Sequence, residues 1–194
     1  MPIGHTGAPV PPEAAEGVAR GAPLEHWLLR AALSPAEAWA RWEESGVAWL
    51  RPGDRFGAVA LRAALVHAAL GLTSPMACVT TLDVRLGGGP VFYRDHHFGG
   101  EGSYTMLIPA GASQGWRAAG AVTYSWHAQV EVPAPEIVRP EGALPWWVVP
   151  PGGPDALCDP EALAALAAQG HAALEGQRGA REVAPRSSRR RGSI

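Results

Sequence analysis

Glycine and proline interrupt this chain so often that most of its elements must be short. The 194 residues include 24 glycines and 19 prolines, which is above ordinary usage. Both residues are typical of turns, and both end or bend helices and strands. The sequence therefore favours short strands joined by turns over a bundle of long helices. At this length, with 47% hydrophobic residues, we expect one domain with a sizeable core.

A capping pattern predicts a helix after Ser34. This serine begins the sequence Ser-Pro-Ala-Glu, in which serine and glutamate have capping-box spacing and proline takes the first helical position. Trp39 and Trp42 follow on one helical face, three residues apart. We expect both indoles to pack in the core under the sheet.

The remaining apolar segments predict short strands with helices before and after them. Strands are expected at 47–50, 56–61, 91–93, 104–108, 121–126, 129–132 and 146–149. Helices are expected at 24–33, at 62–70 and from 159 to about 174, whereas 76–86 fits either a helix or a strand. Residues 95–102 are expected to form a polar turn. This order predicts an α+β fold with a mixed or antiparallel sheet covered by helices.

Charge is distributed unevenly along the chain. The formal net charge is −2, and from Glu175 onward six arginines and two glutamates give +4, which leaves −6 for the rest. Because 1–22 and 176–194 lack apolar periodicity, we expect a disordered leader and a disordered arginine-rich tail around one α+β domain at 23–175. Any nonspecific attraction to DNA is expected from the tail, through Arg178, Arg181, Arg186, Arg189, Arg190 and Arg191.

Several classes of protein are disfavoured by what the sequence lacks. It has no apolar run of membrane-spanning length and no signal-peptide pattern, so we expect a cytoplasmic protein without membrane contact. Cys78 and Cys158 form no CxxC pair, which favours reduced, buried thiols over a disulfide framework or a zinc site. Every one of the 16 basic residues is arginine and asparagine is absent, a bias that indicates high-GC bacterial coding.

One polar cluster could carry chemistry. His96 and His97 follow Arg94 and Asp95, but adjacent side chains on an extended segment point to different sides. A metal site would therefore need His127 or Asp95 to come close in the fold. The alternative is a solvated hairpin tip, and we expect no metal and no cofactor.

The glycine-rich segments do not form a nucleotide-binding motif. Residues 87–90 and 99–103 have neither the lysine of a P-loop nor the strand-GxGxxG-helix context of a dinucleotide site. Turn glycines are the simpler interpretation. A GxSxG elbow is also absent, and no spacing marks a Ser-His-Asp triad.

Aromatic residues gather in the strand-rich half and leave two roles open. On an exposed sheet they would stack on nucleic-acid bases, whereas in a thin core they would be buried. The acidic body favours burial. The residues are Tyr93, Tyr104, Trp116, Tyr124, Trp126, Trp146 and Trp147.

Five short motifs follow one another from the helical lead-in into the strand-rich half. They read SPAEAWARW, GVAWL, FGAVAL, GGGPV and SYTMLIPAG. In this order they resemble the small prim-pol-like proteins of high-GC actinobacteria, which are similar to the N-terminal domain of bifunctional DNA primase/polymerases. The likeness runs from Trp39 to Leu174 and implies a scaffold of the archaeo-eukaryotic primase superfamily.

The resemblance does not extend to the catalytic residues. Active members of the superfamily hold two metal ions with an Asp-x-Asp pair and a third acidic residue, and a histidine after a glycine-rich turn contacts the nucleotide phosphates. The two cations neutralise the triphosphate and the attacking oxygen. In this sequence 58–62 has no carboxylate, 101–104 has no histidine and 124–127 has no acid.

We therefore expect a non-catalytic prim-pol-like domain, an accessory protein that contacts DNA or a replication partner. Two alternatives stay open: a protein-interaction module without a nucleic-acid role, and an enzyme that uses His96, His97 and His127. Salt-dependent DNA binding distinguishes the first two, because phosphate contacts release counterions. Metal content after gentle purification tests the third.

Overall fold

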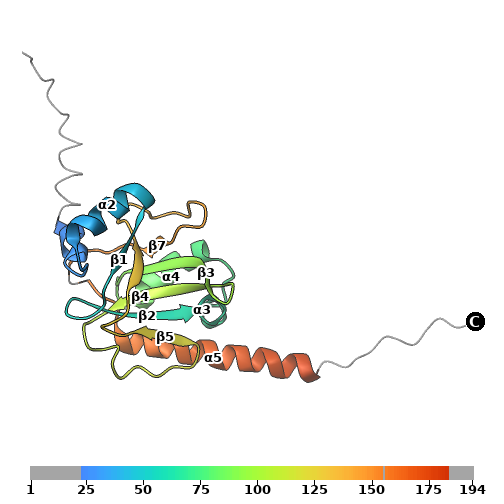
Figure 1. Ribbon diagram of the computed structural model, residues 1–194. Helices are drawn as coiled ribbons and strands as arrows, with labels where there is room; N and C mark the ends of the chain where they lie inside the picture. Colours follow the sequence, from blue (N-terminus) through green and yellow to red (C-terminus); the bar gives the residue numbers. More distant parts are fainter. Residues whose placement is uncertain (1–22, 155, 184–194) are drawn as a thin grey trace, which may run out of the picture.

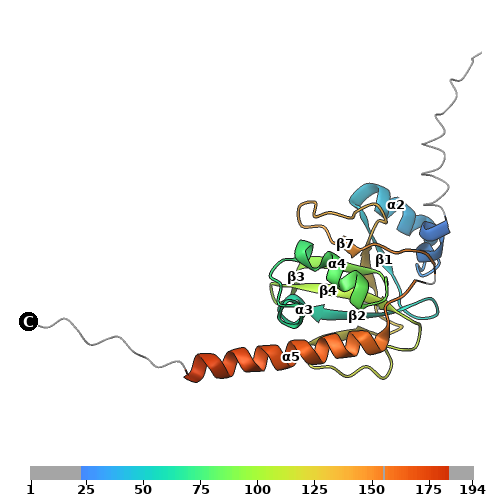
Figure 2. The same cartoon turned by 180° about the vertical axis from the view of Figure 1, so that it is seen from behind.

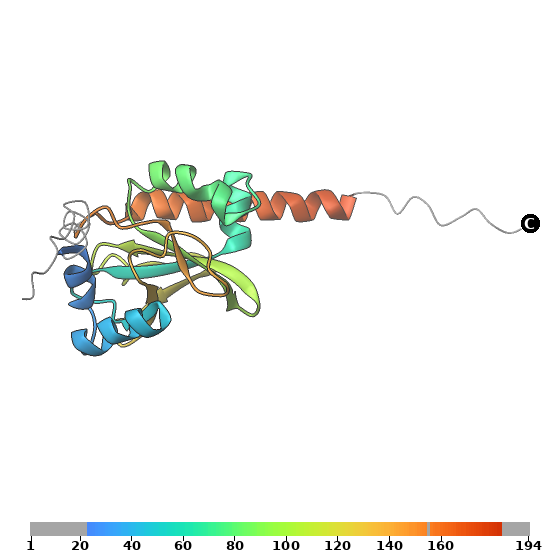
Figure 3. The same cartoon turned by 90° about the horizontal axis from the view of Figure 1, so that it is seen from above.

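The computed structural model describes residues 23–154 and 156–183. They form three layers, with a five-stranded antiparallel sheet in the middle (Figure 1 and Figure 3). The α+β class, with an antiparallel sheet covered by helices, is therefore confirmed, while the predicted leader at 1–22 lies outside the described residues. Helices comprise residues 23–29, α2 (Pro35–Ser45), α3 (Ala63–Leu70), α4 (Pro75–Arg85) and α5 (Pro160–Val183). The strands are β1 (Val47–Leu50), β2 (Gly57–Arg62), β3 (Val91–Phe98), β4 (Glu101–Ile108), β5 (Ala121–Tyr124), β6 (Val130–Pro133) and β7 (Trp146–Val149).

The central sheet has the strand order β5-β2-β4-β3-β7, and each neighbouring pair is antiparallel. β3 and β4 are joined at Gly99 and Gly100, which have φ values of 62° and 99°. Two consecutive positive φ angles are typical of a tight two-residue hairpin turn. The turn predicted at 95–102 is therefore confirmed only at this glycine pair, and its bounds are wrong because β3 continues to Phe98 and β4 begins at Glu101.

Three helices cover one face of the central sheet (Figure 2). Residues 76–86, for which helix and strand were both open, belong largely to α4, whose first turn is capped by the Ser74 side chain accepting from Ala77 N–H at 3.3 Å. Cys78 and Leu82 lie four residues apart on the buried face of this helix. This helical spacing of buried residues outweighs the strand preference of its β-branched residues.

A close contact joins α3 to α5. A Cβ atom added to Gly170 of α5 would lie only 2.3 Å from the backbone oxygen of Leu65 in α3. A glycine at this position allows the two backbones to approach. The thiols of Cys78 and Cys158 are free and buried, as expected.

The other face of the central sheet meets a smaller layer. Here β1 and β6 pair as a two-stranded antiparallel sheet, next to α2 (Figure 3). Trp42 of α2 is 6% exposed, and its indole N–H donates to the Val132 carbonyl at 3.1 Å. Trp39 is 41% exposed. The prediction that both indoles lie in the core is right for Trp42 and wrong for Trp39, because the buried stripe of α2 consists of Ala38 and Trp42.

The last helix is longer than predicted. We expected it to end near residue 174, with the tail starting at 176, but α5 continues to Val183. Residues 175–183 hold good helix formers such as glutamate, glutamine and arginine, and the next proline is Pro185, before which a helix is expected to stop. Residues 184–194 of the predicted tail lie outside the described residues.

The helices were also compared with the length of a membrane span. Among the described residues, no single helix is long and apolar enough to cross a bilayer. α3 and α4 have the required length and apolar composition only when taken together, and this pair is bent by 70°.

Candidate functional site

One face of the central sheet is turned toward β1 and β6, and we call it the β1–β6 face. Residues paired across neighbouring strands share a face, and Ala60 pairs with Thr105 while Arg94 pairs with Ser103. Ser103 and Thr105 are the two buried polar residues among the described part of the chain. The side chains of this face include those of Ala58, Ala60, Arg62, Phe92, Arg94, Ser103, Thr105, Leu107, Val122 and Tyr124.

Three side chains form a hydrogen-bonded chain on this face. The Ser103 hydroxyl lies 2.8 Å from His97 Nδ1, and the Tyr124 hydroxyl lies 3.2 Å from His97 Nε2. The His97 and Tyr124 rings are stacked at an interplanar angle of 9°. The register shift between Arg94 and Phe98 in β3 is a bulge, which re-aims side chains, and His97 thereby reaches the face that carries Ser103.

An ion pair lies beside this chain. Arg94 of β3 pairs with Glu131 of β6, and both line a cavity of about 130 Å³ together with Trp49 of β1. Burial, and secondly the charge of Arg94, lowers the pKa of His97 below its usual value, so the imidazole is neutral at neutral pH. The cavity is smaller than a typical ligand pocket of roughly 300 Å³ or more.

The hydrogen-bonded chain lacks two features of a catalytic triad. In a triad the second imidazole nitrogen meets a carboxylate, which orients the ring and stabilises its positive charge. Here that nitrogen meets the phenol of Tyr124, and Ser103 is only 1% exposed, so its hydroxyl is closed to a substrate. We interpret the chain as a link that satisfies buried polar groups and ties β5 to the β3–β4 hairpin.

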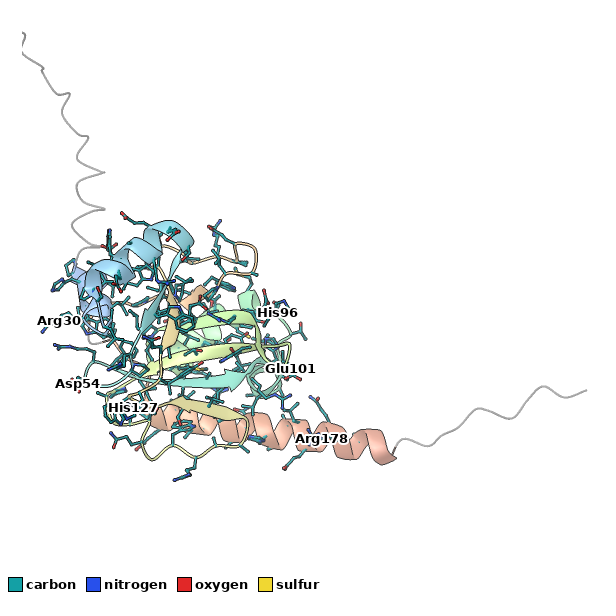
Figure 4. The ribbon with its side chains drawn as sticks, in the orientation of Figure 1. Arg30, Asp54, His96, Glu101, His127 and Arg178 are labelled. Carbon is teal, nitrogen blue, oxygen red and sulfur yellow. The ribbon has the colours of Figure 1, made fainter. Side chains whose placement is uncertain are left out.

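The histidines of the predicted polar cluster are not brought together. His96 and His127 lie on opposite sides of the molecule in Figure 4, and His97 is engaged by Ser103 and Tyr124. Within 23–154 and 156–183, no group of three or more His, Cys, Asp or Glu side chains is placed to hold a metal ion.

The three segments compared with primase catalytic residues do meet on the β1–β6 face. Ala58 and Ala60 of β2 are fully buried there, and Ala58 pairs with Tyr124 across β5. Two carboxylates come near this face, and each is paired with an arginine. Glu101 lies 2.6 Å from Arg62, and Glu131 pairs with Arg94.

The arginines expected to bind nucleic acid fall into two groups. Arg178 is exposed on α5, in the part of the helix that projects beyond the sheet (Figure 4), and Arg181 belongs to the last turn of the same helix. The other four lie outside the described residues: Arg186, Arg189, Arg190 and Arg191.

The aromatic residues of the strand-rich half differ in burial, and base stacking stays a prediction. Tyr93, Tyr104, Trp146 and Trp147 are buried, whereas Trp126 is 61% exposed. Trp126 lines a cavity with Arg30, Arg51 and Arg55, which sequence reasoning missed. The connection between β1 and β2 brings Arg51 and Arg55 to the same cavity, but no sequence signal connects them with Arg30 or with Trp126.

Comparisons with known proteins add nothing to this geometry. No family model, no curated protein and no solved structure matches the chain.

Proposed function

We propose that this chain is a non-catalytic prim-pol-like domain, an accessory protein that contacts DNA or a replication partner. The observation that carries the proposal is the composition of the β1–β6 face. Ala58 and Ala60 lie two residues apart on β2 of the five-stranded sheet, where the resemblance would require an Asp-x-Asp pair. Without these carboxylates the face has no pair of ligands to share two cations.

Charge supports contact with DNA through the C-terminal segment. Arg178 is exposed on the projecting end of α5 (Figure 4), and five further arginines follow it in the sequence. The rest of the chain carries −6 and repels phosphate over roughly a Debye length. An attraction supplied by a few arginines should be weak and strongly dependent on salt.

Two measurements on the purified full chain test this proposal. Binding to a labelled duplex, followed by fluorescence anisotropy, should weaken steeply as salt rises. Primer extension with magnesium or manganese should give no product. Template-dependent incorporation that is lost when Ser103 or Tyr124 is replaced would contradict the non-catalytic assignment, and salt-insensitive binding would contradict the phosphate contacts.

The alternative is a protein-interaction module. Its supporting observation is a set of large apolar side chains left in solvent, among which Trp39 of α2 and Trp49 of β1 are 41% and 42% exposed. Exposed aromatic residues are typical of interface centres. A partner bound through these indoles would be lost in a Trp39→Ala, Trp49→Ala variant and would stay bound at high salt.

A further inference from the structure

Two adjoining cavities lie where the β1–β2 turn meets the connection after β5. The first has a volume of about 320 Å³ and is lined by residues from 30–33 and 51–55 together with Trp126. The second has a volume of about 420 Å³ and shares Pro52, Gly53 and Trp126 with the first. We call the two cavities together the Trp126 groove. Its volume is in the range of small-molecule binding sites. It adjoins the hydrogen-bonded chain at Tyr124, which also lines the second cavity.

The first cavity is positively charged within an acidic body. Three arginines line it, Arg30, Arg51 and Arg55, against one carboxylate, Asp54, and Arg30 and Asp54 are seen on the same side of the molecule in Figure 4. None of the three arginines forms an ion pair with a described residue. Arginines without carboxylate partners around a cavity favour an anionic ligand, with phosphate geometry suited to the guanidinium fork.

Arg51 gives a second indication that the first cavity favours an anionic ligand. Its Nε atom is buried and has no hydrogen-bond partner among the described residues. A buried donor without an acceptor is costly, and an anion in the cavity would supply the acceptor.

Backbone hydrogen bonds fix the frame that holds the arginines. The Arg51 N–H donates to the Ala31 carbonyl at 2.7 Å, which joins the end of β1 to the segment after the first helix. The Gly53 N–H donates to the Phe56 carbonyl at 2.8 Å and closes the turn that carries Asp54 and Arg55. A site on a fixed frame loses less entropy when its ligand binds.

Trp126 joins this charged cavity to a neutral one. Its indole is 61% exposed and lines both cavities, and the His127 ring lies against it. The second cavity has no charged lining residue, but it has hydroxyl and amide groups from Ser113, Gln114, Thr123 and Ser125. An exposed indole between arginines and neutral hydrogen-bonding groups matches a nucleotide, whose base stacks on aromatic rings and whose phosphate binds arginine.

We propose that the Trp126 groove binds a nucleotide unit of single-stranded nucleic acid, with the base on Trp126 and a phosphate at Arg51 and Arg55. The inference rests on the proposed function and adds to it a contact surface in the folded body, separate from the arginines of α5 and the tail. A free nucleotide offers the same chemistry as one unit of a strand, and the experiment separates the two.

The experiment uses the full chain and a fluorescent oligothymidine dodecamer with one 5-iodouracil. Irradiation of the complex should cross-link the base to Trp126, as mapped by mass spectrometry of peptides. In anisotropy titrations, Trp126→Ala should weaken binding about 5- to 150-fold, the range for loss of one base stack. Arg55→Ala should lower the slope of log K against log salt by about one. Trp39→Ala and Arg41→Ala are the controls, because both side chains are exposed and neither lines the groove, and they should bind as wild type.

The outcomes separate the groove from the tail. Two results would refute nucleotide binding in the Trp126 groove: cross-linking confined to the peptides after Gly176, or a Trp126→Ala variant that binds as wild type. Either result would leave the proposed DNA contact through the tail intact. A second variant has serine in place of every arginine from Arg178 onward. If Trp126→Ala loses binding and this second variant does not, the result would support binding in the groove and contradict binding through the tail. If the wild-type chain binds no strand at all, both proposals would be refuted. Where the groove is supported, displacement by dTMP would identify a single free nucleotide as sufficient, and its failure would identify the strand as the ligand.

Discussion

The two tryptophans of α2 provide a sharp test of how this fold is held together. Trp42 is 6% exposed and Trp39 is 41% exposed, although they lie on neighbouring turns of one helix. Trp42 also donates its indole N–H to the Val132 carbonyl in β6 at 3.1 Å. A single buried side chain therefore ties α2 to the two-stranded sheet by both packing and hydrogen bonding.

The structure sets the size of the expected effect. A buried tryptophan removes about 200 Å² from water, worth about 5 kcal/mol at 25 cal/mol per Å². Substitution of a buried aromatic residue by alanine usually costs about 3 to 5 kcal/mol. Trp42→Ala should reach the upper part of that range, because the Val132 carbonyl also loses its donor. Trp39→Ala should cost less than about 1 kcal/mol, as for other surface substitutions.

Urea unfolding followed by circular dichroism measures these free energies. A domain of this kind is usually stable by only about 5 to 15 kcal/mol, so Trp42→Ala can lose enough stability to unfold. Trp42→Phe therefore serves as a second variant. It keeps an aromatic ring but loses the donor, and should cost about 1 to 3 kcal/mol. The assignment of the two indoles would be refuted if Trp39→Ala were as destabilising as Trp42→Ala, or if Trp42→Phe had no effect.

Three further predictions concern α5 and the two histidines with lowered pKa, His67 and His97. Gly170→Ala should destabilise the fold by about 1 to 3 kcal/mol, because the added Cβ would collide with the Leu65 carbonyl. Gly176→Ala is the control on the same helix, since a Cβ added there has no atom within 4 Å. It should stabilise the fold by up to about 1 kcal/mol, and urea unfolding measures both changes. Burial lowers the pKa of His67 and His97, so below about pH 6.5 the unfolded chain binds more protons than the folded one, and stability should fall with acidification. His67→Gln should reduce that fall in melting temperature, while the exposed-residue control His96→Gln should leave it unchanged. Ending the chain after Gly176 should preserve the melting temperature, because residues 177–180 are exposed, and should weaken retention on duplex DNA; unchanged retention would contradict the role of the tail.

The parts of the fold that were predicted correctly are those encoded by local signals. Ser34 caps α2 as its capping-box pattern indicates, with its side chain accepting from Glu37 N–H. The strands at 47–50 and 146–149 have the expected bounds, because each is a short apolar run between turns. These signals depend only on neighbouring residues and can therefore be recognised without knowledge of the tertiary structure.

The errors arise where strand pairing or packing overrides local preference. Residues 95–98 are mainly polar and resemble a loop, yet they extend β3 because it continues to pair with β4 up to Phe98 and Glu101. Trp39 and Trp42 are both tryptophans and lie close together around the axis of α2. Only the position of β1 and β6 therefore decides which indole is buried.

The candidate site also depends on tertiary contacts that local sequence signals do not encode. Spacing alone could not reveal that His97, and not His96, meets Ser103, because this depends on a bulge in β3. Nor could it reveal the Trp126 groove, whose residues come from four segments that meet only in the fold: 30–33, 51–57, 111–114 and 123–126.

The burial of Ala58 and Ala60 has a consequence for carboxylates placed at these two positions. Both alanines are fully buried on β2, and nearby Glu131 is neutralised by Arg94. Two carboxylates at 58 and 60 would be desolvated side by side, and without cations to bind them each would carry a penalty of several kcal/mol or stay protonated. Alanine avoids that penalty and lets β1 and β6 lie over the sheet, with a cavity of only about 130 Å³ left between the layers at Arg94 and Glu131. Two carboxylates introduced at 58 and 60 would therefore not create a polymerase site, because a triphosphate with two cations has no room to reach β2. The nucleotide that we propose as a ligand would instead bind at the edge of the sheet, where Trp126 is exposed.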